Sequence, residues 1–178
     1  MALFNFMDTK AVCYNVGTMT RKAGSEYVPN YQPEDVFDAG IVASNLPSIR
    51  GFSVRPRDDV ISFGSIVDVG LRIQGLTLGS QTKVTEFERG EMLRLETVRG
   101  SDATASLEFV LHEDEEQPGT QVEYAINVEG RALYVRLAKP AITAFMSSNT
   151  SLLVQTYRDN IINYLDRRTG ATGPRQAS

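Results

Sequence analysis

Three polar residues interrupt the apolar side-chain pattern of the chain, and they are the first candidates for chemistry. Tyr124 lies in the middle of an alternating strand segment, whereas Asn149 and Tyr157 fall on the apolar stripe of a predicted helix. A buried phenol or amide normally needs a hydrogen-bond partner. The three side chains could together orient the single polar end of a ligand. Alternatively, they bond to one another or to the main chain inside an ordinary core.

The other reactive residue types offer little for catalysis. His112 is the only histidine, and it shares strand parity with Glu108 rather than with the apolar positions, so we expect it on the surface beside an acidic turn. Cys13 is the only cysteine and has no neighbouring base. The sequence contains neither a glycine-rich phosphate loop nor a nucleophile motif. We therefore predict no catalytic residue, no metal and no cofactor.

Composition narrows the class of protein. The chain has 178 residues, of which 42% are hydrophobic, and this suits one domain with a substantial core. A formal charge of -4 argues against nucleic acid as a partner, because such binding relies on a cationic surface. No run approaches the roughly 20 apolar residues that cross a bilayer, and the first residues lack the basic start of a secretory signal. We expect a reduced, cytoplasmic, metal-free protein.

A hairpin and a long helix must position the three polar candidates. Residues 104–112 and 121–129 alternate apolar and polar side chains around a turn at 114–119. Apolar residues then recur at three- and four-residue spacings over 142–165, which is typical of an amphipathic helix. Pro140 suits the first turn of that helix. We expect the helix to lie across the apolar face of the sheet.

Further strands are predicted upstream of this hairpin. Residues 60–79 alternate almost without a break, and two more strands follow at 81–89 and 91–98. Residues 33–40 begin with proline and two acidic residues, which predicts a short helix. The predicted fold class is therefore α+β, with a curved antiparallel β-sheet wrapped around a long C-terminal α-helix.

The two ends of the chain carry weaker patterns. Residues 10–17 predict an edge strand, whereas residues 18–30 have few apolar side chains and predict a loop. The apolar patch Leu3–Met7 either docks on the domain or contacts a membrane surface or a protein partner. Residues 169–178 predict a disordered tail. The domain itself is expected to span residues 31–168.

Several short motifs resemble those of a known superfamily. In chain order they are Pro33-Glu-Asp-Val-Phe37, Asn45-Leu-Pro47, Val69-Gly-Leu-Arg-Ile73, Thr85-Glu-Phe-Glu-Arg-Gly90, Gly119-Thr-Gln-Val-Glu-Tyr124 and Gly130-Arg-Ala-Leu133. The first two resemble the opening of the START-like (SRPBCC) superfamily. The others resemble its polyketide cyclase/dehydrase branch, and the last two also resemble relatives of the G subunit of carbon monoxide dehydrogenase. The resemblance implies a helix-grip fold around an apolar cavity, but no single reaction.

Under this resemblance, the inner-face residues become candidate ligand-binding residues. They are Phe63, Val67, Val69, Leu71, Leu93, Leu95, Phe109, Tyr124, Ile126, Phe145, Asn149, Leu153 and Tyr157. Residues 133–139, which precede the long helix, are a hypothetical lip of the cavity mouth. An apolar pocket needs few polar anchors, so the preferred function is binding or transport of a lipid-like, polyketide-like or aromatic small molecule.

Two other functions are compatible with the same residues. In the first, the protein is a cyclase, aromatase or dehydratase in which Tyr124 and Asn149 polarise a carbonyl group. The sequence provides no inward-facing acid or base for that chemistry. In the second, the protein is an adaptor that uses the patch Leu3–Met7 or the polar sheet face to meet a membrane or an enzyme complex.

Overall fold

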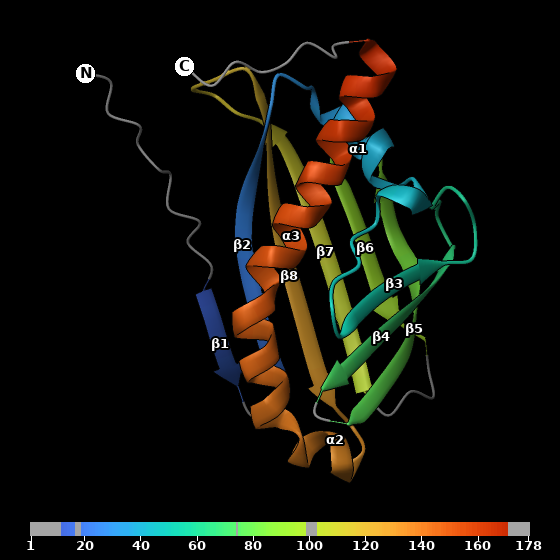
Figure 1. Ribbon diagram of the computed structural model, residues 1–178, viewed down its shortest axis with the longest axis vertical. Helices are drawn as coiled ribbons and strands as arrows, with labels where there is room; N and C mark the ends of the chain where they lie inside the picture. Colours follow the sequence, from blue (N-terminus) through green and yellow to red (C-terminus); the bar gives the residue numbers. More distant parts are fainter. Residues whose placement is uncertain (1–11, 17–18, 74, 99–102, 171–178) are drawn as a thin grey trace.

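The computed structural model describes residues 12–16, 19–73, 75–98 and 103–170. The patch Leu3–Met7 and residues 171–178 of the expected tail lie outside these ranges. The described strands form one antiparallel sheet in the order β1-β2-β8-β7-β6-β5-β4-β3. Helix α3 (Lys139–Thr169) crosses this sheet diagonally, with strands on both of its sides (Figure 1).

Seven antiparallel pairs join the eight strands of this sheet in the described part of the chain. Its strands are β1 (Val12–Val16), β2 (Met19–Pro29), β3 (Phe52–Pro56), β4 (Ile66–Ile73), β5 (Leu76–Glu88), β6 (Met92–Thr97), β7 (Ala103–Glu113) and β8 (Gly119–Gly130). The helical segments are α1 (Pro33–Gly40), the 3-10 turn η1 (Ala43–Asn45), α2 (Leu133–Leu137) and α3. A curved antiparallel sheet that holds a long C-terminal helix is the predicted architecture, and it is confirmed.

The central hairpin has the predicted register. Leu107 of β7 lies opposite Ile126 of β8, and Phe109 lies opposite Tyr124. Directly opposed residues share one face of a sheet, so these apolar side chains all face α3. The turn between the strands is held by Asp114, whose Oδ1 accepts hydrogen bonds from the two main-chain N–H groups of residues 116 and 117 at 2.9 and 3.0 Å.

Strand β2 replaces the loop that was predicted for residues 18–30. It pairs with β8 along its whole length, from Met19 opposite Glu129 to Pro29 opposite Gly119. Its positions on the α3 side include Lys22, Gly24 and Glu26, because they lie opposite the inward residues of β8. Apolar alternation is therefore absent, and the strand forms because the main chain pairs with β8. The predicted edge strand before it is confirmed as β1.

The long alternating segment 60–79 divides differently from the prediction. Residues 61–65 form a turn rather than a strand, with Gly64 at φ +84° and the Ser65 hydroxyl donating to Asp58 at 2.9 Å. Strand β4 begins only at Ile66, and a second turn at Gly75 (φ +83°) leads into β5. Positive φ angles favour glycine, so both turns lie where the sequence supplies it.

Helix α3 begins as predicted, with Pro140 in its first turn after the short helix α2. Its buried stripe faces the sheet and consists of Ile142, Met146, Thr150, Leu153, Val154, Ile161 and Leu165. Gly170 ends the helix in the left-handed conformation at φ +68°. No helix in the described part of the chain has the length and apolar character needed to span a bilayer.

Candidate functional site

The space between the sheet and α3 contains two adjoining apolar cavities. The volume open to the centre of a water molecule is about 50 Å³ in the β4-side cavity and about 30 Å³ in the β2-side cavity. The first is lined by Leu46, Pro47, Phe52, Val54, Ile61, Val67, Val69, Leu93, Leu95, Leu107, Phe109, Ile126, Leu153, Val154 and Tyr157. The second is lined by Glu26, Val28, Val36, Phe37, Gly40, Ile41, Leu93, Phe109, Leu111, Val122, Val154, Tyr157, Arg158 and Ile161.

Four side chains line both cavities, and we call them the dividing wall: Leu93, Phe109, Val154 and Tyr157. The rings of Phe109 and Tyr157 lie 5.8 Å apart between centroids, at a tilt of 57°. The Tyr157 hydroxyl donates a hydrogen bond of 2.7 Å to the carbonyl of Gly40, at the end of α1. Burial raises the pKa of this hydroxyl, so the phenol remains a neutral donor.

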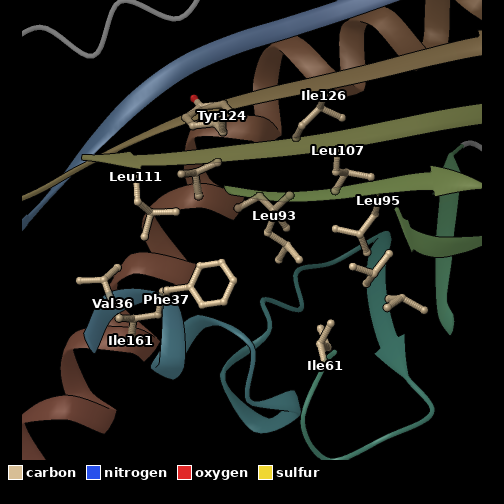
Figure 2. Close-up of a cluster of buried hydrophobic side chains, with 14 of the residues drawn as sticks. Val36, Phe37, Ile61, Leu93, Leu95, Leu107, Leu111, Tyr124, Ile126 and Ile161 are labelled. Atoms are coloured by element: carbon tan, nitrogen blue, oxygen red, sulfur yellow. The ribbon is translucent and has the colours of Figure 1, made fainter. Parts of the chain in front are cut away.

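The side chains around the wall pack from three directions. Figure 2 shows Leu93 and Leu95 projecting from β6 towards Phe37 of α1 and towards Ile61 of the loop before β4. Phe37 also meets Phe87 edge to face, with ring centroids 5.0 Å apart. Such interdigitated packing holds the sheet side of the cavities in a defined shape.

Eight of the predicted ligand-binding residues line the cavities. They are Val67, Val69, Leu93, Leu95, Phe109, Ile126, Leu153 and Tyr157. All eight come from β4, β6, β7, β8 or α3, where strand alternation or helical spacing indicates the inner face directly. The structure therefore brings most of the predicted inner surface together.

The other five predicted residues lie elsewhere. The prediction that Phe63 lies on the inner face is wrong, because Phe63 is 69% exposed. The turn at Gly64 takes it out of the sheet, so strand parity does not apply. Leu71 and Phe145 are partly buried but line neither cavity. Tyr124 and Asn149 also lie outside both linings. None of the described side chains of residues 133–139 lines either cavity, so the hypothetical lip gains no support.

The three polar candidates are not joined into one cluster. Asn149 Nδ2 donates to the Phe145 carbonyl of its own helix at 2.9 Å, and Tyr157 bonds to the Gly40 main chain. These two residues follow the alternative in which the main chain satisfies them. Tyr124 is different, because its buried hydroxyl has no hydrogen-bond partner among the described residues. His112 is exposed at the hairpin, as predicted.

Two charged residues at the β2-side cavity were missed by the sequence analysis. Glu26 is only 6% exposed, and its Oε2 lies 3.2 Å from Nη1 of Arg158 on α3. Burial raises the pKa of the Glu26 carboxyl above its ordinary value of 4.5, and the nearby Arg158 only partly opposes this. The other carboxylate oxygen, Oε1, has no partner in the described part of the protein. The only sequence signal for Glu26 is its parity with Val28, within a segment too polar to predict a strand.

These surroundings suit apolar contact with one charged group at the edge. Among the described side chains, no three His, Cys, Asp or Glu residues lie close enough together to hold a metal ion. Glu26 provides an inward-facing carboxyl group that the sequence pattern did not predict. The arrangement can hold a small apolar molecule and, at one end, donate or accept a proton.

Comparisons with known proteins identify the fold. No protein-family model matches the sequence, and neither does any curated protein. Among solved structures, TTHA0849 from Thermus thermophilus is similar with a TM-score of 0.59 at 15% identity, covering 81% of this chain and 98% of that one. The protein of unknown function SA2116 from Staphylococcus aureus has a TM-score of 0.58 at 13% identity, covering 83% and 96%. Ara h 8.0201 has a TM-score of 0.52 at 12% identity, covering 82% and 97%.

These likenesses show the helix-grip fold, in agreement with the sheet order and the position of α3. At such low identities they carry no information about a ligand or a reaction. The chemistry must therefore be argued from the side chains of this chain.

Proposed function

We propose that the protein binds a hydrophobic small molecule in the two cavities between the sheet and α3. The observation that carries this proposal is the pair of adjoining apolar spaces, which share the side chains of the dividing wall. A lipid-like, polyketide-like or aromatic molecule matches this lining. The resemblance to the polyketide cyclase/dehydrase branch supports the same class of ligand.

The size and polarity of the cavities favour apolar occupants. A cavity needs a volume of roughly 10–15 Å³ open to the centre of a water molecule before it admits one water. Apolar cavities stay dry even when they are larger. Both cavities exceed this limit, and the β4-side lining offers almost no hydrogen-bonding group. A ligand gains about 0.8 kcal/mol for each methylene that it buries. One that exceeds either cavity must displace Phe109 or Tyr157, and this joins the two spaces.

Filling the larger cavity tests the proposal. We expect the neutral fluorescent probe N-phenyl-1-naphthylamine to bind the full chain, and Val69→Phe to weaken that binding about tenfold or more, because the new ring occupies the space the probe needs. Val110→Phe is the matched control, because Val110 of β7 pairs with Met92 and Glu123 on the opposite face of the sheet. Fluorescence titration measures both affinities.

A second filling variant guards against misfolding. Leu153→Phe places the extra volume on the α3 side of the same cavity, and circular dichroism checks that each variant is folded. Native mass spectrometry of the purified wild-type chain should also show a co-purifying apolar molecule. Equal probe affinity in both filling variants and in the control would contradict the proposal, as would a wild-type chain that binds no probe.

An enzymatic function has one observation in its favour. Glu26 faces the β2-side cavity with a raised pKa, and such a carboxyl group can act as a general acid or base. We propose as the second candidate a cyclisation or dehydration of a polyketide-like substrate, in which Glu26 transfers the proton. Incubation with a poly-β-ketone thioester, followed by mass spectrometry, should then show product with the wild type and none with Glu26→Gln. Uncatalysed product levels in both would remove this candidate.

A further inference from the structure

Two buried polar atoms on the inner face of β2 and β8 have no hydrogen-bond partner within the described ranges. They are Oε1 of Glu26, which lines the β2-side cavity, and the hydroxyl of Tyr124, which lies outside the lining, on the residue paired with Gly24. Their side chains are only 6% and 3% exposed, so solvent does not reach them freely. A buried polar atom without a hydrogen bond costs about 1–3 kcal/mol. Two such atoms at neighbouring inward positions, one of them in the lining of an apolar cavity, therefore indicate a position that a polar group fills.

Gly24 places the two groups on the same part of the inner face. A Cβ atom at Gly24 would lie only 2.5 Å from the Tyr124 hydroxyl, so this hydroxyl rests directly above the Gly24 main chain. Glu26 is the next residue of β2 on that face, about 6–7 Å further along the strand. Its charge also contributes, after burial, to the raised pKa of Tyr124, so the phenol stays protonated and can donate.

The charges beside these atoms determine which polar group fits. Glu26 already shares its Oε2 with Arg158, so a second cation would meet the positive guanidinium. A carboxylate would instead meet the negative charge of Glu26. A neutral hydroxyl group has neither conflict, because it donates its proton to a carboxylate oxygen and accepts a hydrogen bond from a phenol.

The position is also close to solvent. Arg158 lines the β2-side cavity and, on its other side, an open groove between β2 and α3 of about 570 Å³. The Arg158 side chain is 33% exposed and additionally bonds Asp159 at 2.9 Å. Arg158 thus contacts both the buried carboxylate and the groove.

We propose that Oε1 of Glu26 and the hydroxyl of Tyr124 bind the hydroxyl group of an alcohol or phenol, whose apolar body occupies the β2-side cavity. This inference rests on the proposed binding function and specifies the ligand class for the same site. The inference gives the two surfaces different roles: the apolar lining binds the apolar body of the ligand, and the β2 side selects its hydroxyl group.

A matched ligand series tests the inference on the full chain. Toluene, benzyl alcohol, benzylamine and benzoate share one apolar body and differ in the polar group. Isothermal titration calorimetry or protein-observed NMR gives their dissociation constants. We expect Tyr124→Phe to weaken benzyl alcohol binding about 3- to 10-fold, the value of one hydrogen bond, and to leave toluene binding unchanged. We also expect benzoate and benzylamine to bind more weakly than benzyl alcohol.

Tyr27→Phe is the matched control, because the Tyr27 hydroxyl bonds to the Pro118 carbonyl at 2.7 Å near the end of the hairpin. It should change none of the four affinities. Glu26→Gln is the second variant; it removes the negative charge, so it should improve benzoate binding relative to benzyl alcohol. If Tyr124→Phe alters neither benzyl alcohol nor toluene binding, only water fills the position and the inference is wrong. If the wild type binds no toluene either, the proposed binding function itself fails.

Discussion

The two halves of the inner sheet face differ in polarity, although both lie under α3. From β4 to β7, the inward positions carry aliphatic side chains such as Val67, Leu95 and Leu107, all at most 9% exposed. On β2, the corresponding positions carry Lys22, Gly24 and Glu26. The comparison shows that one helix can cover both an apolar packing surface and a charged one. Under the proposed binding function, the apolar half would recognise the shape of a ligand and the β2 half would recognise its polar group.

The largest expected effect is on the apolar half. Leu93 is 6% exposed and belongs to the dividing wall, so Leu93→Ala should lower the free energy of unfolding by about 2–5 kcal/mol and join the two cavities. Met92→Ala, on the opposite face of β6, should cost less than about 1 kcal/mol. Urea denaturation measures both values. Equal losses in the two variants would mean that the inner and outer faces of β6 do not differ in packing.

Steric crowding on the β2 half should give a smaller effect. Gly24→Ala places a Cβ atom 2.5 Å from the Tyr124 hydroxyl, so the phenol must shift, at a cost of about 1–3 kcal/mol. Gly79→Ala in β5 is the control, because a Cβ atom there meets nothing within 4 Å. The difference between the unfolding midpoints tests whether Tyr124 rests on β2. A stable Gly24→Ala protein with an unmoved Tyr124 would refute that contact.

Charge removal on the β2 half should produce an effect that depends on pH. Arg158→Leu leaves Glu26 buried without its cation and should cost about 1–2 kcal/mol at pH 7, less than in a fully buried pair because Arg158 is 33% exposed. The pKa of Glu26 is raised in the folded protein, so protons bind more tightly to the folded than to the unfolded state.

The sign of this pH dependence follows directly. The stability that Glu26 gains by protonation is complete below its unfolded pKa of about 4.5 and is lost as pH rises through the raised folded value. The destabilisation by Arg158→Leu should therefore shrink as pH falls from 7 towards 4. Urea titrations at several pH values measure this, with Glu26→Gln as the pH-independent reference. If the destabilisation by Arg158→Leu grew as pH fell, the raised pKa of Glu26 would be contradicted.

The smallest expected effect lies outside both halves. Asp38 of α1 accepts two hydrogen bonds from Arg89, at 2.8 and 2.6 Å, and these lower the pKa of its carboxyl group. Its contribution to stability is therefore present above the unfolded pKa of about 3.8 and is lost as pH falls through the lowered folded value. In Arg89→Gln, the free energy of unfolding should no longer fall at acid pH through Asp38. This pH dependence is opposite in sign to that of Glu26, which gains stability by protonation. Thermal melts between pH 2 and 5 provide the measurement.

The sequence predicts the apolar half well because its pattern is a direct consequence of burial on one side. Strands β7 and β8 alternate strictly, and α3 carries apolar residues at helical spacing, so their inner faces can be identified residue by residue. The prediction failed at Phe63, where the Gly64 turn interrupts the strand parity. The β2 half could not be predicted, because a strand with Lys22, Gly24 and Glu26 inward has no apolar period.

Neither the division of the cavity nor its charged edge can be read from local patterns. Glu26 and Arg158 meet across 132 residues of sequence, and no motif connects them. The dividing wall depends on the side-chain conformations of Phe109 and Tyr157. Sequence periodicity does not determine these conformations. The fold class and most lining residues are thus local information, whereas the shape and polarity of the site arise from tertiary contacts.

The hydrogen bond from Tyr157 to the Gly40 carbonyl connects the dividing wall to the end of α1. Under the proposed binding function, a ligand long enough to fill both cavities would push the Tyr157 ring aside and break this hydrogen bond to α1. The main-chain amides of α1 should then exchange faster with deuterium. The rate of amide exchange in this eight-residue helix would thus report the size of the bound ligand.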